Sequence, residues 1–411
     1  MKTDFDKIID RKNTACFKWD LNKEGFKRKD IISMWVADMD LPVAPEITKS
    51  IIDRASHPVY GYTFRNDDFY RPYIAWQAKR NQWQIERDWI INSCSVVISI
   101  NMILQAMTPK KGRILIMTPV YGQFSATVNL AKRVLINSPM RNMDGFYTPD
   151  FTDIEQHFKD GIDAFILCSP HNPVGRVWTK SELLRMAELC LQYNVLLIAD
   201  EIHSDLVYEE SHHIPIASLS KEISAITITC TAPGKTFNIS GLSIGFIIIE
   251  NKEIRNKIYE IFSSQHLLAA NIFGIEACRT AYEKGDRWLS EALSYLQSNR
   301  DFLVDYINNE IPLLEVYQPE GTYLAWIDFR NLKLSQSDLI CFLVFVAGLG
   351  LDNGGKFGDD GLGFMRLNFA CSRILLKKAL DHLAASVRKL IDVDLDIRKL
   401  IDESEVIEDC D

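Results

Sequence analysis

Six short apolar runs follow one another between residues 113 and 249, and they are rich in Ile, Val and Leu without polar alternation. They are residues 113–117, 133–136, 164–168, 195–199, 225–230 and 244–249. Such runs are typical of strands that are buried on both faces. Helical stretches lie between several of them, and one begins at Thr179 with Glu182 three residues on, the pattern of a capping box. This order predicts an α/β fold with a mainly parallel sheet.

The pattern changes at both ends of this region. We expect residues 1–45 to form an irregular arm with short elements, and residues 46–285 to form a large domain. After residue 285 a long helical stretch, Arg287 to Asn308, precedes a mixed segment, a glycine-rich loop at 348–363 and a final helix. Residues 286–390, together with the arm, are expected to form a smaller α+β domain, and 391–411 an acidic tail without an assigned function.

Composition narrows the class of protein. The 411 residues carry a formal net charge of −9, from 46 basic and 55 acidic side chains, which argues against nucleic acid as the main partner. No apolar run approaches the ~18 residues of a membrane span, and the polar N-terminus has no signal-peptide core. The nine cysteines are scattered without a C-x-x-C pair, as in reduced proteins. We therefore expect a cytoplasmic protein with no membrane partner.

Three polar side chains follow consecutive apolar runs. They are Asn172, Asp200 and Lys235, and in parallel α/β folds such positions gather at the carboxyl ends of the strands. An amine that forms a Schiff base, a carboxylate for a pyridinium nitrogen and an amide for a ring oxygen together suit pyridoxal 5′-phosphate. Alone, the lysine would be interpreted as a solvated surface charge and the aspartate as a helix N-cap. Their combination predicts a cofactor site.

Further candidates surround these three. His203 could reach the ring oxygen, and Tyr121 could stack on the ring, although a structural histidine and a core tyrosine are the ordinary alternatives. Val96 and Val97 precede a helical run, where backbone N–H groups at a helix N-terminus would bind phosphate. Arg366 suits a substrate α-carboxylate as a bidentate partner.

Two patterns of other site types are set aside. The segment Gly234-Lys235-Thr236 resembles the end of a phosphate-binding P-loop, but Thr229 stands where the leading glycine should be. His212 and His213 lack a cysteine or carboxylate at ligand spacing, so no metal site is predicted.

Several segments together carry a resemblance to a known family. They are residues 18–20, 35–40, 60–63, 170–178 (PHNPVGRVW), 200–205, 235–238, 322–326 and 366–368. Through them the chain is similar to the fold-type-I pyridoxal phosphate enzymes, and within these to the MalY/PatB group of cystathionine β-lyases. The resemblance covers about residues 4–390.

The resemblance implies an aspartate aminotransferase-like fold, with a seven-stranded, mainly parallel sheet in the large domain. It implies Lys235 and Tyr121 as catalytic residues, with Tyr121 stacked on the ring, and it implies the cofactor and substrate roles already given for Asn172, Asp200, His203, Val96, Val97 and Arg366. Tyr62 would reach the phosphate and the substrate of a neighbouring subunit, which implies a homodimer.

Phosphate anchoring departs from the pattern of related enzymes. Aminotransferases of this fold commonly place an arginine eight residues after the lysine, where this chain has Ser243. The hydroxyl often found just before the lysine is missing, since Ala232 and Gly234 stand there. Thr231 is the candidate substitute.

The implied activity is that of a cystathionine β-lyase, or cysteine-S-conjugate β-lyase. By α,β-elimination it would convert L-cystathionine or related S-substituted cysteines to pyruvate, ammonia and a thiol such as homocysteine, a step of transsulfuration and methionine biosynthesis. Two alternatives stay open: an aminotransferase that acts on an amino acid and keto acid pair, and a regulatory binding protein that retains the fold. The preferred leaving group and any assembly beyond a dimer are also open.

Overall fold

All six apolar runs become strands of one sheet in the computed structural model, which describes residues 3–392. The sheet has seven strands in the order β2-β10-β9-β8-β7-β3-β4. Their bounds are Ile90–Ser93, Gly245–Ile248, Thr227–Thr231, Leu196–Asp200, Ala164–Cys168, Arg113–Thr118 and Val134–Pro139. Strand β10 is antiparallel to both neighbours, and the remaining pairs are parallel. The predicted mainly parallel, seven-stranded sheet is confirmed.

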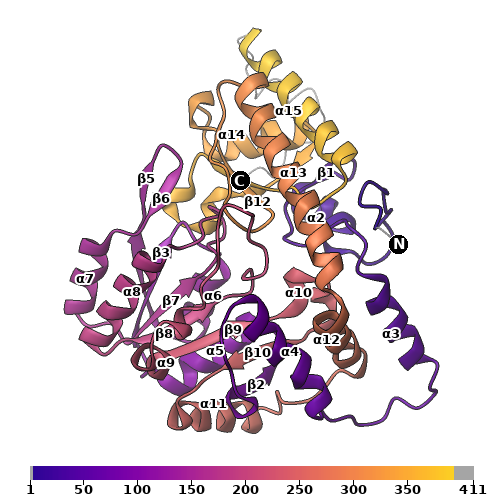
Figure 1. Cartoon of the computed structure of the whole chain (residues 1–411). Helices are drawn as coiled ribbons and strands as arrows, with labels where there is room; N and C mark the ends of the chain where they lie inside the picture. Colours follow the sequence, from indigo (N-terminus) through magenta and orange to yellow (C-terminus); the bar gives the residue numbers. More distant parts are fainter. Residues whose placement is uncertain (1–2, 393–411) are drawn as a thin grey trace.

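Helices cover both faces of this sheet (Figure 1). Ile114 and Ile116 of β3 pack in one core with residues of α5, α6 and α11, whereas Leu115 and Met117 pack in another with α7 and α8. This alternation follows from the period of two along a strand. The bounds are Val96–Met107, Gln123–Leu130 and Lys252–Ser264 for α5, α6 and α11, and Phe151–Lys159 and Lys180–Tyr193 for α7 and α8. Helix α8 begins with the predicted capping box of Thr179.

A second, four-stranded antiparallel sheet lies beyond the carboxyl ends of the central strands. Its order is β11-β12-β15-β14, with bounds Glu315–Val316, Leu324–Asp328, Phe364–Asn368 and Asp352–Asn353. Helices α13 (Asp286–Glu310), α14 (Gln336–Cys341) and α15 (Arg373–Asp392) accompany it. The long α13 runs from the side of the central sheet up beside α15 (Figure 1), and it begins one residue before the predicted stretch and ends two residues after it.

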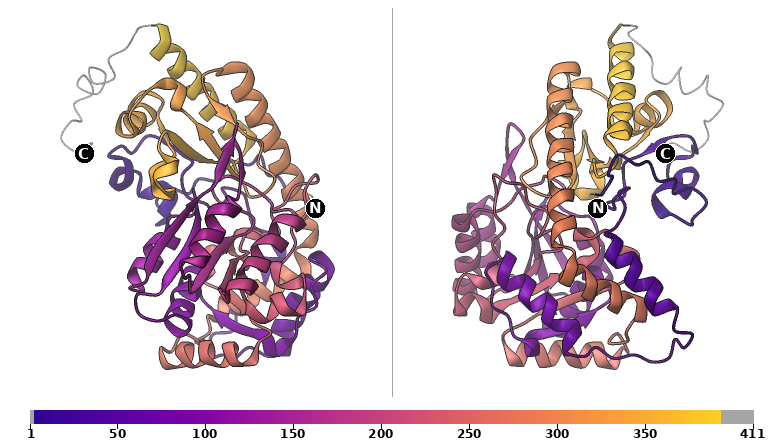
Figure 2. Two further views of the ribbon diagram at one scale, coloured as in Figure 1. Left: turned by 90° about the vertical axis from the view of Figure 1, so that its left-hand side faces the viewer. Right: turned by 45° about the vertical axis from the view of Figure 1, so that its right-hand side comes forward.

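The N-terminal arm lies against this second sheet (Figure 2). It holds α1 (Phe17–Asp20), α2 (Asn22–Phe26) and β1 (Ile32–Ser33), and β1 pairs in parallel with β13 (Leu349–Gly350). The arm leads into α3 (Pro45–Ala55) and α4 (Asp67–Arg80), which contact α12 (Ile272–Lys284). The predicted domain boundaries stay predictions, and the acidic tail lies, from residue 393 on, outside the described residues.

The remaining elements are short. They are the hairpin β5–β6 (Arg141–Met143 and Phe146–Thr148), α9 (Lys221–Ile226), α10 (Pro233–Thr236), 3₁₀ turns at Arg87–Trp89, Ile216–Ser218, Ser240–Leu242, Arg330–Leu332, Gly354–Phe357 and Asp359–Gly361, and a π-helical turn at Phe342–Val346. Within residues 3–392, no helix combines the length and the apolar composition that crossing a membrane requires.

Candidate active site

A cavity of about 530 Å³ lies where the central strands end, below the arm and the second sheet. Eight of the residues singled out from the sequence line it: Val96, Val97, Tyr121, Asn172, Asp200, His203, Lys235 and Arg366. They come from α5, from the loops after β3 and β7, from the end of β8 and the loop after it, and from α10 and β15. The fold therefore brings together side chains that are distant in the sequence.

Lys235 lies on the single turn of α10, directly after β9, and Pro233 starts that turn. Its Nζ donates a hydrogen bond to the carbonyl of Ala37. Burial and the nearby Arg366 lower the pKa of Lys235 to about 8. A larger share of this amine is therefore unprotonated near neutral pH than for a lysine in water, as a nucleophile requires.

Asp200 ends β8 and is buried. Burial raises the pKa of its carboxyl to about 7, although its Oδ1 accepts a hydrogen bond from the Ile202 N–H (3.0 Å). His203 is buried as well, and burial, Lys235 and Arg366 lower its pKa to about 3, so it is neutral. Within residues 3–392 its Nδ1 has no hydrogen-bond partner. The attraction of the nearby Lys235 thus does not offset the effect of burial on Asp200, and the Nδ1 of His203 is left for a ligand.

Asn172 and Arg366 are joined directly. The Asn172 Oδ1 accepts a hydrogen bond from Nη1 of Arg366 (3.0 Å). The Nη2 of the same guanidinium donates to the Trp35 carbonyl (2.8 Å) and pairs with Asp352 Oδ2 (2.7 Å). Because the amide oxygen of Asn172 is engaged, its NH₂ group is the part that can donate to a ligand. The Nε of Arg366 is buried and has no partner within the described residues.

Tyr121 lies beneath a loop that comes from the second sheet. Its N–H donates to the Asn172 carbonyl (3.1 Å), and the preceding Val120 N–H donates to the Phe357 carbonyl (2.9 Å). At Gly122 the loop comes so close that an added Cβ would lie 2.2 Å from the Lys356 oxygen. Burial raises the pKa of Tyr121. The Tyr121 ring is thus neutral. The backbone contacts of residues 120–122 fix its position in the wall of the cavity.

The first turn of α5 forms another wall. Ser95 is the N-cap and its side chain accepts from the Ile98 N–H (3.5 Å), while Val96 and Val97 are the first two helical residues. N–H groups of a first turn have no intrahelical acceptor and favour an anion. The exposed Ser240 also lines the cavity.

Two predicted residues lie elsewhere. Thr231, the last residue of β9, is buried and is absent from the residues that line the cavity. Tyr62 is fully exposed on the segment before α4 and is absent from the lining of this cavity too. Its predicted role requires a second subunit and is unaffected by its place in a single chain.

Sequence reasoning missed several contributors. The Ala37 carbonyl, Asp352 and Ser240 belong to the site, but a backbone oxygen has no sequence signal, and the other two stand in segments without a motif. His213 was set aside for want of a carboxylate at ligand spacing. In the fold, its Nε2 lies 3.2 Å from Oε2 of Glu201, the residue that follows Asp200, and both side chains are buried.

These residues fit pyridoxal phosphate. The buried carboxyl of Asp200 suits a protonated ring nitrogen, with which it would form an ion pair. The unpartnered Nδ1 of His203 and the free NH₂ of Asn172 suit the ring oxygen. The amine of Lys235 suits an aldehyde, and the first turn of α5 suits a phosphate. No group in this set conflicts with the cofactor.

Known proteins resemble this chain over nearly its full length. The model of the family "Aminotransferase class I and II" matches residues 29–383. The chain is 36% identical over 384 residues to cystathionine β-lyase PatB of Bacillus subtilis (strain 168), covering 93% of this chain and 99% of that protein. It is 31% identical over 389 residues to protein MalY of Escherichia coli (strain K12), covering 94% and 99%. The crystal structure of cystalysin from Treponema denticola, which contains pyridoxal 5′-phosphate, matches with a TM-score of 0.92 and 33% identity, covering 95% and 100%.

Proposed function

The chain belongs to the class I and II aminotransferase family and is of its MalY/PatB type, and from that premise we propose that it is a pyridoxal phosphate-dependent carbon–sulfur β-lyase. It cleaves L-cystathionine or related S-substituted cysteines by α,β-elimination to pyruvate, ammonia and a thiol such as homocysteine. The observation that carries the proposal is the single cavity in which Lys235, Asp200, Asn172 and Arg366 meet.

Each of these residues has a task in the reaction. Bound pyridoxal phosphate supplies a sink for the electrons of the substrate Cα–H bond. Arg366 binds the substrate α-carboxylate, and the Asn172 bond to its Nη1 fixes the guanidinium plane. Asp200 would hold the proton on the ring nitrogen, and Tyr121 would cover the ring face. The Asn172 NH₂ and His203 would donate to the ring oxygen.

Lys235 moves the proton. As a free amine, Lys235 would be a base whose pKa of about 8 suits removal of the α-proton near neutral pH. The bond from Cβ to sulfur then breaks, and its electron pair leaves with the sulfur. Lys235, now protonated, or a neighbouring tyrosine gives a proton to that thiolate. The aminoacrylate that remains hydrolyses to pyruvate and ammonia.

The test compares the native chain with Lys235→Ala. With L-cystathionine and no keto acid, the native protein should release pyruvate and an equal amount of thiol, and Lys235→Ala should release neither. Turnover that needs an added keto acid would instead make the protein an aminotransferase. A cellular regulatory effect that persists in Lys235→Ala would favour a binding protein that retains the fold.

The same proposal includes a homodimer with shared sites. The segment before α4 exposes large apolar side chains, with Tyr62 fully exposed and Phe64 80% exposed. Such a patch on a soluble enzyme is typical of an interface. The exposed Ser240 also lines the cavity, and a second subunit could add a side chain there. Tyr62 of the partner subunit would then reach the phosphate.

Cellular context completes the proposal. The eight cysteines within residues 3–392 form no disulfide with one another, which fits a cytoplasmic protein. Homocysteine as the thiol product would supply methionine biosynthesis by transsulfuration. In a methionine auxotroph that lacks this activity, the native chain should restore growth on cystathionine. The Lys235→Ala variant should not restore it.

A further inference from the structure

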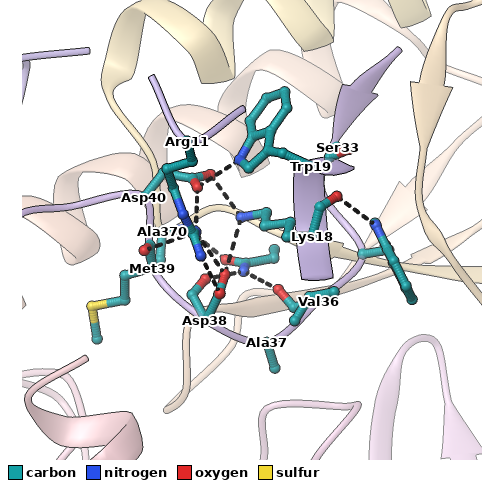
Figure 3. A network of polar contacts seen from close by, with 12 residues as sticks. Arg11, Lys18, Trp19, Ser33, Val36, Ala37, Asp38, Met39, Asp40 and Ala370 are labelled. Carbon is teal, nitrogen blue, oxygen red and sulfur yellow. Dashed lines mark hydrogen bonds and ion pairs between the residues drawn. The ribbon is translucent and has the colours of Figure 1, made fainter. Parts of the chain in front are cut away.

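Four charged side chains of the N-terminal arm form a cluster that the reaction does not use. Arg11, Lys18, Asp38 and Asp40 make up this arm cluster (Figure 3). Nζ of Lys18 lies 2.7 Å from Asp40 and 3.7 Å from Asp38. The guanidinium of Arg11 lies 2.6 Å from each carboxylate. Two positive charges therefore balance two negative ones.

The cluster is costly to break. Lys18 is completely buried and Asp40 is 8% exposed, and the indole of Trp19 donates to Asp40 Oδ1 (2.9 Å). Loss of one member of a buried ion pair leaves the other charged and without its partner. The charges therefore fix the position of the backbone that carries the two aspartates.

The carbonyls of residues 35–38 accept hydrogen bonds from side chains of the large domain and of the second sheet. The Trp35 carbonyl accepts from Arg366 (2.8 Å), and those of Val36 and Asp38 accept from the Asn368 amide (2.6 Å each). The Ala37 carbonyl accepts from Nζ of Lys235 and from the Tyr323 hydroxyl (2.9 Å). Four consecutive carbonyls are thus held by side chains, of which Lys235 and Arg366 line the cavity.

Local secondary structure does not hold this segment. The residues between β1 and α3 form no helix or strand, and the Met39 N–H uses a side chain, Asn238 Oδ1 (3.0 Å), as its acceptor. Apart from the Asp40 N–H, which donates to the Ala370 carbonyl (2.8 Å), the position of the Ala37 carbonyl therefore depends largely on side-chain contacts. The arm cluster, with its buried Lys18 and Asp40, supplies several of these contacts.

We propose that Lys18 and Arg11 are positioning residues for the lyase reaction: through Asp38 and Asp40 they hold the Ala37 carbonyl as the acceptor for the Lys235 amine whenever that amine is free. The carbonyl keeps Nζ on the inner side of the cavity, so the general base stays aligned with the α-proton. A shift of about 1 Å in such an acceptor can lower the rate by up to about 100-fold.

The proposal rests on the proposed function, because Lys235 must be the reactive amine. The competing explanation is that the cluster stabilises the arm and nothing more. Stabilisation alone lowers the melting temperature, whereas positioning also changes kcat and the titration of the amine. Both kinds of readout are therefore needed.

The test uses Lys18→Met and Asp40→Asn, which remove one charge and keep the side-chain size. Asp30→Asn is the matched control, since it breaks an exposed pair with Arg28 (2.9 Å) on the same arm. We expect kcat for pyruvate release to fall at least about tenfold with KM nearly unchanged in the first two variants. The pH midpoint of the visible absorbance of the holoenzyme should move. Asp30→Asn should match the native protein in both.

Hydrogen–deuterium exchange of the cofactor-free protein separates failure of this proposal from failure of the proposed function. Backbone amides of residues 34–41 should exchange faster in both variants, whether or not the protein is a lyase. Lower melting temperatures with native kcat, absorbance midpoint and exchange would overturn the positioning role. If Lys18→Met does not fold, Asp40→Asn and the milder Arg11→Lys decide by the same readouts.

Discussion

The amide oxygen of Asn172 accepts a hydrogen bond from the Arg366 guanidinium at 3.0 Å, which couples the loop after β7 to strand β15 of the second sheet. Arg366→Lys keeps a positive charge but loses the planar set of donors that serves Asn172 and a substrate carboxylate together. We expect kcat/KM for L-cystathionine to fall about 100-fold, or about 2.7 kcal/mol, mainly through KM. Steady-state pyruvate assays measure this.

Arg388→Lys is the control, because Arg388 is an exposed residue of α15 that pairs with Glu310 of α13. It should leave both constants within about twofold of native. A fall in kcat with native KM in Arg366→Lys would contradict a carboxylate-binding role.

Asp200 should make the stability of the cofactor-free protein depend on pH. Its pKa is raised from 3.8 to about 7 by burial, so the folded state binds the proton more tightly than the unfolded one. The contribution of the Asp200 carboxyl to the free energy of unfolding is fully present below pH about 4 and is lost as the pH rises through about 7. Asp200→Asn cannot ionise, so it should gain stability relative to the native chain between these values.

Thermal unfolding of both cofactor-free proteins at pH 5 and pH 8 measures the difference. The melting temperature of Asp200→Asn relative to native should be higher at pH 8 than at pH 5. Lyase activity should fall by at least about 100-fold in the same variant, since the ring nitrogen loses its carboxylate. An equal difference at both pH values would show that the carboxyl titrates normally.

The uptake of the cofactor should also depend on pH. The free base of Lys235 is the proposed nucleophile, and its pKa is lowered to about 8. The rate of covalent uptake by the cofactor-free protein should therefore rise with pH and level off above about 8, rather than above the 10.5 of an ordinary lysine. Stopped-flow absorbance measures this rate, with Lys235→Ala as the unreactive control.

Two inactive variants should restore each other if the sites are shared between subunits. Lys235→Ala lacks the reactive amine, and Tyr62→Ala lacks the side chain proposed to enter the partner's site. A mixed dimer holds one site with both residues intact, so random mixing should recover about one quarter of the native activity. Mixing without gain, when each variant forms stable dimers, would place Tyr62 outside the partner's site.

The close contact at Gly122 predicts a steric effect. Its φ of −59° is ordinary, but a Cβ would lie 2.2 Å from the Lys356 oxygen. Gly122→Ala should cost about 1–3 kcal/mol of stability and lower kcat/KM, because the neighbouring Tyr121 moves with the loop. Gly241→Ala, with nothing within 4 Å of its added Cβ, is the matched control. Denaturant unfolding compares the two.

The sequence revealed the parts of this molecule that depend on local pattern. Strands buried on both faces read as uninterrupted apolar runs, so β7, β8 and β9 could be located, and with them the places of Asn172, Asp200 and Lys235. The capping box of Thr179 is equally local. Arg366 was a candidate from its chemistry, and the known family added the motif that it forms with its companions on β15.

What the sequence did not reveal depends on contacts between distant residues. An apolar run does not state its direction, so the antiparallel β10 was not foreseen. The Ala37 carbonyl carries no side-chain signal, and the pairing of Asp352 with Arg366 requires β14 and β15 to be adjacent. Thr231 was favoured for its hydroxyl near Lys235, yet it ends a buried strand, while Ser240 at the next turn lines the cavity.

The parallel pair of β1 and β13 joins the first strand of the chain to one near its end, and this sets an order for biosynthesis. A nascent chain on the ribosome presents Lys235 and Asp200 well before β13 and β15 have emerged. Until then the arm has no strand to pair with, and the cavity lacks Arg366. The protein can therefore acquire a competent site only once nearly all of it has been translated, so cofactor loading is a late event.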